Sequence, residues 1–494
     1  MTSVARSFIA MLTLFAAGSA SAVPAAEHCA NDPKVGFGDA LVCYHDAVEH
    51  EPLSYERGPT TTVAGVERRN YVLTSQQWSP DRLVQPTAWQ HDVSIYVPPN
   101  ALPTRALLIS TNGTRRPTDG GPAQQPNEFP PEVLADLAQR TRTVVVSLGD
   151  IPSQSLTYSD DGRARREDDS VAHSWSLFMK APDRRKTLPL HVPMAAAIGR
   201  TMSLAERELA SLHIHRFILT GTSKRGWASW HAMVADRRVD AVVPFVTDVL
   251  NMPAVLDHMY RAYGGNWPIA FGPYVKEGLT SQFDTPAFAK LTQIQDPLAY
   301  LKTPYRKRLS IPKYIVNASG DDFFLPDNTQ FFYGKLPGPK AMRMVPNSSH
   351  AGIRASVVES LVPLVSRLQQ QRPLPELIDA LRGGKQPVIR IRFAERPTQV
   401  RLWSAVNPKA RDFRFACGIR YAATPVVLQG GSTIAVPVKI PEAGWGAYFV
   451  EATYSDGFVA TSQTYVLGEQ QYPNQAPPSD NAACQTLPGI ASTP

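Results

Sequence analysis

Short runs of nearly continuous apolar residues recur along the chain up to residue 345, and they predict the buried strands of a sheet. Between several of these runs, apolar residues recur at the three- and four-residue spacing of a helix. Strands that alternate with helices are typical of an α/β fold in which helices cross over between parallel strands. The predicted strands lie at 106–110, 143–148, 217–220, 239–246, 314–318 and 341–345, and the predicted helices at 132–140, 191–212 and 352–369.

The pattern differs in two other parts of the chain. Residues 69–74 and 92–97 alternate apolar and polar side chains, which predicts an antiparallel pair of half-buried strands that leads into the sheet. Beyond residue 385, short strand-like runs are separated by turns with Pro, Gly and Asp-Gly, which is typical of a small β-sandwich. These runs lie at 388–393, 399–403, 433–440, 448–454 and 459–466.

Two long intervals separate predicted strands. Residues 149–190 are polar and irregular, which predicts an excursion over the edge of the sheet. Residues 249–312 contain several aromatic side chains, among them Tyr263 and Trp267. An insertion of this length and composition favours a cap over a site, with a packed helical appendage as the alternative.

A sharp turn follows the apolar run at 217–220. Gly221 breaks the run, Ser223 comes two residues later, and helical spacing begins at Lys224. A strand, a turn that carries a serine and then a helix is the arrangement of a nucleophile elbow. Gly226 stands one residue later than the second glycine of the usual Gly-x-Ser-x-Gly pattern, so a serine that only caps a helix is the alternative interpretation.

An acid and a histidine follow the next strands of the predicted sheet. Asp321 comes after the strand that ends at residue 318, and His350 comes after the strand that ends at residue 345. Serine, aspartate and histidine in this order, each after a strand, is the chain order of an α/β-hydrolase triad. Ligands of open α/β sheets bind at that edge. Asp321 is the predicted acid, and Asp322 and Asp248 are the alternatives.

Two segments could supply the oxyanion donors of such a site. The backbone N–H of Lys224 is the first amide after Ser223 and is the first candidate. Asn112 and Gly113 follow the predicted strand at 106–110 and are the candidates for the second donor.

Several longer motifs are more specific than any single turn. They are TGTSKRGW at 220–227, DVLNM at 248–252, AYGG at 262–265, NASGDDFFLPD at 317–327 and VPN at 345–347 before His350. Together they resemble one family, the PhoPQ-activated pathogenicity-related proteins. The resemblance implies an α/β-hydrolase-type domain related to serine peptidases and esterases. It also implies Ser223 as the nucleophile, Asp321 or Asp322 as the acid and His350 as the base.

These observations predict a division of the chain into parts. Residues 1–22 have the charged start, apolar core and Ala-Ser-Ala end of a secretory signal peptide. The α/β-hydrolase-like catalytic domain is predicted at 23–385, with its cap insertion at about 249–312. An all-β sandwich domain follows at 386–468, and a tail at 469–494.

The four cysteines fit an exported protein. We predict the pairs Cys29–Cys43 and Cys417–Cys484, because each closes a loop within one end of the chain; the other pairings of these cysteines stay open. Metal binding is the rival interpretation, but the sequence has no CxxC spacing.

The formal net charge is +7, and acidic residues surround the short basic runs, which argues against a nucleic-acid partner. No apolar stretch predicts a membrane span. We predict a periplasmic or secreted serine hydrolase that cleaves peptide or ester bonds of a peptide or small-molecule substrate, without metal or organic cofactor. The alternative is an exported binding, signalling or virulence-associated protein that keeps the fold without turnover.

Overall fold

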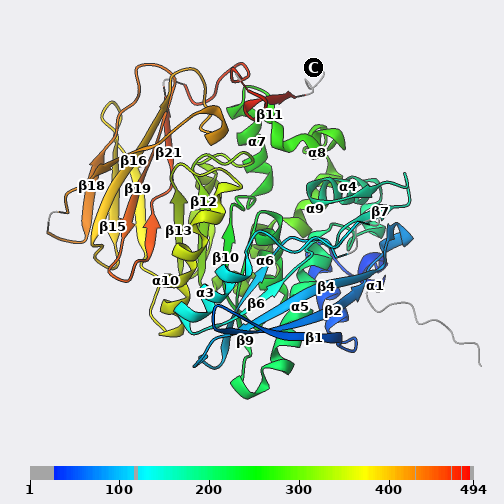
Figure 1. Cartoon of the computed structure of the whole chain (residues 1–494). Coiled ribbons are helices and arrows are strands. Elements are labelled where there is room, and N and C mark those ends of the chain that lie inside the picture. Colours follow the sequence, from blue (N-terminus) through cyan, green and yellow to red (C-terminus); the bar gives the residue numbers. More distant parts are fainter. Residues whose placement is uncertain (1–26, 116–120, 429, 469, 480, 490–494) are drawn as a thin grey trace, which may run out of the picture.

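The computed structural model describes residues 27–115, 121–428, 430–468, 470–479 and 481–489, so the predicted signal peptide lies outside the described residues. Its largest element is a nine-stranded sheet in the order β1-β2-β4-β6-β5-β9-β10-β12-β13 (Figure 1). The strands from β6 to β13 are parallel, and β1, β2 and β4 form an antiparallel extension. The bounds are β1 Ser54–Val63, β2 Val66–Gln77, β4 Ala88–Val97, β5 Arg105–Ser110, β6 Val144–Leu148, β9 Arg216–Thr222, β10 Val239–Phe245, β12 Lys313–Ala318 and β13 Lys340–Val345.

Helices cover both faces of this sheet. Ala106 and Leu108 of β5 pack in one apolar cluster with α5 and α6, whereas Leu107 and Ile109 pack in a second cluster with α3 and α10. Successive side chains of a strand point to opposite faces, so a strand buried on both faces has a continuous apolar run. The predicted α/β architecture is therefore confirmed. The helices are α1 Glu27–Asn31, α2 Ala40–Glu49, α3 Pro131–Thr141, α4 Glu167–Lys180, α5 His191–Glu208, α6 Lys224–Ala235 and α10 Val357–Gln369.

The interval at 149–190 is more regular than the sequence predicts. It contains helix α4 and the short strands β7 Leu156–Tyr158 and β8 Ala164–Arg165, which pair with β3 Val84–Gln85. Val171, Trp175 and Phe178 give α4 a buried face at helical spacing. The polar residues Ser170, His173 and Ser174 are buried as well, so the sequence shows no simple apolar face, and packing against other elements stabilises the helix.

The residues between β10 and β12 form a cap above the carboxyl ends of the parallel strands (Figure 1). The cap consists of short helices joined by 3₁₀ turns and includes one short strand. Its regular elements are α7 Met252–Ala262, β11 Asn266–Pro268, α8 Gly272–Lys276 and α9 Pro286–Gln295.

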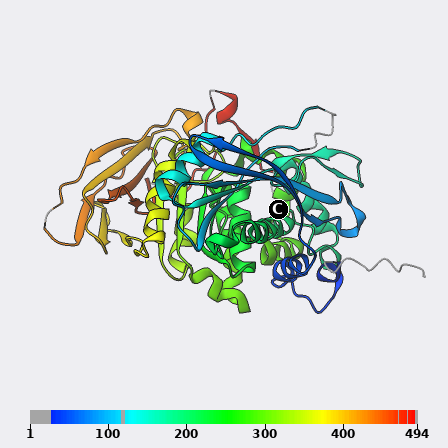
Figure 2. The same cartoon turned by 60° about the horizontal axis from the view of Figure 1, so that its bottom comes forward.

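The C-terminal part consists of antiparallel sheets that lie at the β12–β13 side of the large sheet, away from the N-terminal helices (Figure 2). Tyr314 Oη donates to the Val459 carbonyl at 2.6 Å, and the Met344 amide donates to Thr461 Oγ1 at 3.0 Å, so β20 is bonded to β12 and β13. The strands are β14 Leu377–Arg382, β15 Val388–Phe393, β16 Gln399–Asn407, β17 Ala422–Pro425, β18 Thr433–Pro437, β19 Trp445–Thr453, β20 Val459–Thr461 and β21 Tyr465–Gly468.

The end of the chain returns to the cap. Strand β22 Thr486–Pro488 pairs with β11 in an antiparallel register, Trp267 opposite Leu487. Both predicted disulfides are confirmed: Cys29–Cys43 joins α1 to α2, and Cys417–Cys484 holds the tail on the C-terminal sheets. None of the helices in the described ranges has the length and apolar character needed to span a bilayer.

Candidate active site

Ser223 lies in the turn between β9 and α6 in a backbone conformation that few non-glycine residues adopt. Its φ is 55° and its ψ is −126°. The neighbouring strand holds the turn, because the Ser223 amide donates to the Phe245 carbonyl at 2.8 Å and the Ser223 carbonyl accepts from Thr247 Oγ1 at 3.0 Å. A serine in a strained turn at the carboxyl end of a strand has the geometry of a nucleophile elbow.

Gly226 explains how the unusual motif spacing is accommodated. A Cβ at this position would collide with the Thr247 hydroxyl and would lie 2.8 Å from the Gly221 carbonyl. Helix α6 can therefore pass close to the ends of β9 and β10 only with glycine here. The late glycine supports the close helix–strand approach that an elbow needs.

His350 and Asp321 meet beyond the ends of β13 and β12. His350 Nδ1 lies 2.9 Å from Asp321 Oδ1 and 3.0 Å from Oδ2. The carboxylate is buried, and its Oδ1 also accepts from the amides of Phe323 at 2.7 Å and Phe324 at 3.1 Å. This arrangement leaves Nε2 as the ring nitrogen that can take a proton. Within the described ranges, the structure records no hydrogen bond between Ser223 Oγ and His350.

The two alternative acids have different surroundings. Asp248 is buried, its Oδ1 accepts from Asn317 Nδ2 at 2.7 Å, and burial raises its pKa to about 8. Burial and then the nearby charge of Asp321 raise the pKa of Asp322. In the part of the chain that the structure describes, every hydrogen bond of the His350 ring goes to Asp321.

The segment between β16 and β17 braces both loops that carry this pair. Before His350, the side-chain amide of Asn347 donates to the Tyr421 carbonyl at 3.0 Å and accepts from the Tyr421 amide at 2.7 Å. Before Asp321, the Gly320 carbonyl accepts from the Phe415 amide at 3.0 Å, and a Cβ on Gly320 would lie 2.6 Å from the Phe415 nitrogen. The position of the His–Asp pair therefore depends on contacts with residues far along the chain.

Carboxylates hold the buried basic side chains that begin α6. Lys224 Nζ lies 3.0 Å from both Glu167 Oε2 and Asp168 Oδ2. Arg225 donates to Glu128 Oε1 at 3.0 Å and to Glu167 Oε1 at 2.6 Å. Burial alone would raise the pKa of Glu167, but the charges of Arg225 and Lys224 outweigh it and lower the pKa to about 2. The paired charges join α4, α6 and the loop at 121–130 beneath the elbow.

The predicted oxyanion loop is tied to the same network. Asn112 Oδ1 accepts from the amides of Asn127 at 3.0 Å and Glu128 at 3.2 Å, and Asn112 Nδ2 donates to Asn127 Oδ1 at 2.7 Å. The Asn112 side chain thus shapes the loop, which leaves the backbone amides of Asn112 and Gly113 as its candidate donors. Lys224 is the first residue of α6, and such an amide has no acceptor within its helix.

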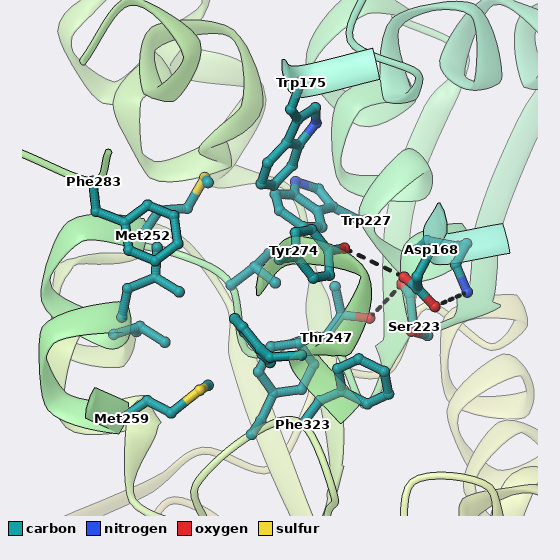
Figure 3. Close-up of a pocket in the computed structure, with 16 residues that line it drawn as sticks. Asp168, Trp175, Ser223, Trp227, Thr247, Met252, Met259, Tyr274, Phe283 and Phe323 are labelled. Atoms are coloured by element: carbon teal, nitrogen blue, oxygen red, sulfur yellow. Dashed lines mark hydrogen bonds and ion pairs between the residues drawn. The ribbon is translucent and has the colours of Figure 1, made fainter. Parts of the chain in front are cut away.

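Ser223 borders a narrow, mainly apolar cavity of about 50 Å³ between the elbow and the cap (Figure 3). Figure 3 shows Ser223 and Asp168 at one end, and Met252, Met259 and Phe283 at the other. Further aromatic residues complete the walls: Trp175, Trp227, Phe271, Tyr274, Phe323 and Phe324. The Phe323 and Phe324 rings also pack on His350, with ring centroids 4.6 Å and 6.2 Å from the imidazole centroid.

The sequence pattern alone does not indicate some of the residues that line this cavity. Asp168 and Trp175 belong to α4, in the interval predicted as irregular. The acidic first turn at 167–169 was the available signal, because acidic residues favour a helix N-terminus. Tyr263 and Trp267, the cap aromatics that the sequence highlights, are buried but do not line the cavity.

Groups of possible metal ligands lie away from this cavity. Among the described residues, two of the four such groups include disulfide cysteines. In the other two, Asp236 pairs with Arg238 and Asp161 pairs with Arg165. No member of these groups lines the cavity next to Ser223.

Comparisons with known proteins agree with the motifs. The family model for PhoPQ-activated pathogenicity-related protein matches residues 41–414. The autocrine proliferation repressor protein A of Dictyostelium discoideum is 30% identical over 408 residues, which cover 77% of this chain and 79% of the relative.

Solved structures with a similar arrangement include two acetyl xylan esterases. The acetyl xylan esterase from Paenibacillus sp. R4 has a TM-score of 0.45 at 12% identity, over 69% of this chain and 95% of its own. Acetyl xylan esterase 1 from Thermoanaerobacterium sp. JW/SL YS485 has a TM-score of 0.39 at 15% identity, over 64% of this chain and 87% of its own.

Proposed function

The chain belongs to the PhoPQ-activated pathogenicity-related protein family and has an α/β-hydrolase-type fold, and from this premise we propose that it is an exported serine hydrolase. In this proposal Ser223 is the nucleophile, His350 the general base and Asp321 the residue that orients the imidazole. The substrate contains a peptide or ester bond.

The proposed reaction proceeds by acyl transfer. Ser223 Oγ bonds to the carbonyl carbon of the substrate while its proton moves to His350 Nε2. The bond from that carbon to the leaving nitrogen or oxygen then breaks, and the leaving group departs with the proton from Nε2. Water repeats these steps on the acyl-enzyme, which releases the acid and restores Ser223.

The electrostatic part of the proposal uses backbone amides. The Lys224 amide at the N-terminus of α6 faces the developing oxyanion, and an amide of Asn112 or Gly113 adds a second donor. Asp321 keeps the proton of the imidazole on Nδ1 and offsets the positive charge that forms on the ring.

The observation that carries the proposal is a strained serine after one strand together with a His–Asp pair after two neighbouring strands, in which the Asp321 carboxylate is buried and His350 is partly exposed. The nucleophile, base and acid thus follow the carboxyl ends of β9, β13 and β12, which are parallel strands of the same sheet. A serine that only caps a helix needs no such pair. Export is supported by the signal-like start of the sequence and by the two disulfides.

A fluorophosphonate probe tests the nucleophile directly. The folded mature protein should be labelled at Ser223, and Ser223→Ala should abolish the labelling. Ser229→Ala is a matched control, because Ser229 lies in α6, the helix that follows Ser223, and its hydroxyl donates to the Arg225 carbonyl at 3.0 Å. Labelling that survives Ser223→Ala would contradict the assignment.

A second candidate is an exported signalling or binding protein without turnover. Its support is the name of the relative from Dictyostelium discoideum, which describes that protein as a proliferation repressor. A folded, disulfide-bonded protein that resists the probe at Ser223 would favour this function over hydrolysis.

A further inference from the structure

Interlocked aromatic rings form one wall of the cavity beside Ser223. Trp175 packs edge-to-face on Trp227 with ring centroids 5.5 Å apart, and lies 5.6 Å from the Tyr274 ring. Trp227 Nε1 donates to the Gln295 carbonyl at 2.6 Å, and Tyr274 Oη donates to Asp168 Oδ1 at 3.3 Å. Trp227 and Tyr274 cannot turn aside without losing these hydrogen bonds, and Trp175 is held by its packing against both rings, so this wall is rigid.

Helix α7 of the cap forms the opposite wall. Met252, Val255 and Met259 lie on one face of this helix and line the cavity (Figure 3). The start of α7 is fixed, because the amides of Asn251 and Met252 both donate to the Asp296 carboxylate at 3.0 Å. Two methionines on an anchored helix therefore limit the depth of the cavity.

The polarity of the cavity selects an apolar occupant. Asp168 and Lys224 are the charged residues among those described as lining it, and they pair with each other at 3.0 Å. A charged group at the methionine end would lose its hydration without gaining an ionic partner, which costs several kcal/mol. An aliphatic group loses nothing there and gains contact with the Met and Phe side chains.

The size of the cavity limits the length of that group. An apolar cavity of about 150 Å³ holds a benzene molecule. The cavity beside Ser223 measures about 50 Å³, which is a third of that volume. By this ratio it has room for about two to three chain carbon atoms beyond the carbonyl carbon before Met252 or Met259 must move.

We propose that this cavity is an acyl pocket, and that the substrates are esters of short straight-chain aliphatic acids with about two to four carbon atoms. This inference rests on the proposed serine hydrolase function. The acyl group enters the pocket when Ser223 Oγ bonds to its carbonyl carbon. The alcohol leaves on the outer side with the proton from His350, and water then releases the short acid.

The test is a series of p-nitrophenyl esters, from acetate and butyrate to octanoate, hydrolysed by the mature disulfide-bonded protein. We expect kcat/KM to fall at least about tenfold between butyrate and octanoate, since misfit of even one methylene in a pocket costs about that factor. The double variant Met252→Ala/Met259→Ala should raise kcat/KM for octanoate relative to acetate by about tenfold.

A matched control separates this effect from general loss of packing. Met202 is fully buried in α5 and does not line the cavity, so Met202→Ala should leave the chain-length preference unchanged. Equal kcat/KM for acetate and octanoate in the unmodified protein would overturn the acyl pocket. So would the same ratio of these two values in Met252→Ala/Met259→Ala and in Met202→Ala.

The outcomes also distinguish this inference from the proposed function. If the fluorophosphonate probe labels Ser223 but none of the esters is hydrolysed, the short-acyl substrate class is wrong and the hydrolase proposal stands. If neither labelling nor hydrolysis occurs in folded protein, the proposed function is wrong, and the substrate class with it.

Discussion

At the scale of single residues, the environment of each carboxylate separates the three candidate acids. The Asp321 carboxylate is bonded to the imidazole and to the amides of Phe323 and Phe324, which fix its orientation. Asp248 instead accepts from Asn317, and burial raises its pKa to about 8. A carboxyl group that holds its proton at neutral pH is a poor partner for an imidazolium ion.

Asp321→Asn should lower kcat by about 10⁴, because the asparagine amide nitrogen would donate to Nδ1 and so stabilise the wrong imidazole tautomer. Steady-state hydrolysis of a p-nitrophenyl ester measures this loss. Asp322→Asn should lower kcat much less. If Asp322→Asn lowers kcat more than Asp321→Asn does, then Asp322 is the acid that orients His350.

Asp248→Asn is the second control. It should leave kcat nearly unchanged but alter how the free energy of unfolding depends on pH. Between about pH 4 and pH 8 the folded protein holds a proton on Asp248 that the unfolded chain releases, so rising pH favours unfolding by about 1.4 kcal/mol per pH unit. The asparagine variant lacks this term, and its free energy of unfolding should fall less steeply over that range. Urea unfolding at pH 5 and pH 8 would detect the difference.

At the scale of elements, the loops after β12 and β13 are held by contacts with backbone atoms of the segment between β16 and β17. Asn347 has a φ of 55° and makes both of its side-chain hydrogen bonds with the backbone of Tyr421. Gly320 packs against the backbone of Phe415. Each loop carries one member of the His–Asp pair, so we assign these contacts a positioning role.

Asn347→Gly should separate positioning from folding, because glycine tolerates the positive φ but cannot bond to Tyr421. We expect kcat to fall about tenfold with KM nearly unchanged, which corresponds to about 1.4 kcal/mol. Asn70→Ala is a matched control. Asn70 lies in β2, at the opposite side of the large sheet from β12 and β13, and its Nδ2 donates to the Pro59 carbonyl at 2.7 Å. Lower stability with an unchanged kcat in Asn347→Gly would show that the contact is only structural.

The sequence predicted the elements that end at Ser223, Asp321 and His350 because strands buried on both faces are continuous apolar runs. It could not predict the cavity, which forms only where α4, α7 and Phe323 meet in space. Nor could it predict that residues 415 and 421 hold the loops of Asp321 and His350. Residues 415 and 421 make these contacts with their backbone atoms, so the identity of their side chains gives no indication of them. Helix α4 was missed because polar residues interrupt its apolar face.

At the scale of the whole molecule, the tail links the C-terminal sheets to the cap. Cys417–Cys484 fixes the tail on one side, and β22 pairs with β11 on the other. Arg414, whose guanidinium pairs with Asp412, also donates to the Cys484 carbonyl at 2.7 Å and the Gln485 carbonyl at 3.0 Å. The disulfide and these bonds together keep the tail in position to complete the cap.

Replacing Cys417 and Cys484 by serine should release the tail. The bridge spans 67 residues, and the lost restraint on the unfolded chain is worth about 4 kcal/mol. We expect limited proteolysis to cut the tail at 470–489 and ester hydrolysis to decline. The Cys29→Ser/Cys43→Ser variant, whose bridge spans only 14 residues, should keep the tail protected. Identical proteolysis of the tail in both variants would show that the Cys417–Cys484 bridge does not hold the tail in place.

The pairing of β11 with β22 also sets an order in time. A chain that folds as it is synthesised acquires its N-terminal parts first. The sheet and the serine turn can therefore form early, whereas the loops of Asp321 and His350 wait for residues 415 and 421, and the cap waits for residues 486–488. A nascent chain would hold its serine before the loops of Asp321 and His350 and the strand β11 have their partners, so a fully braced site would form only when synthesis has passed residue 488.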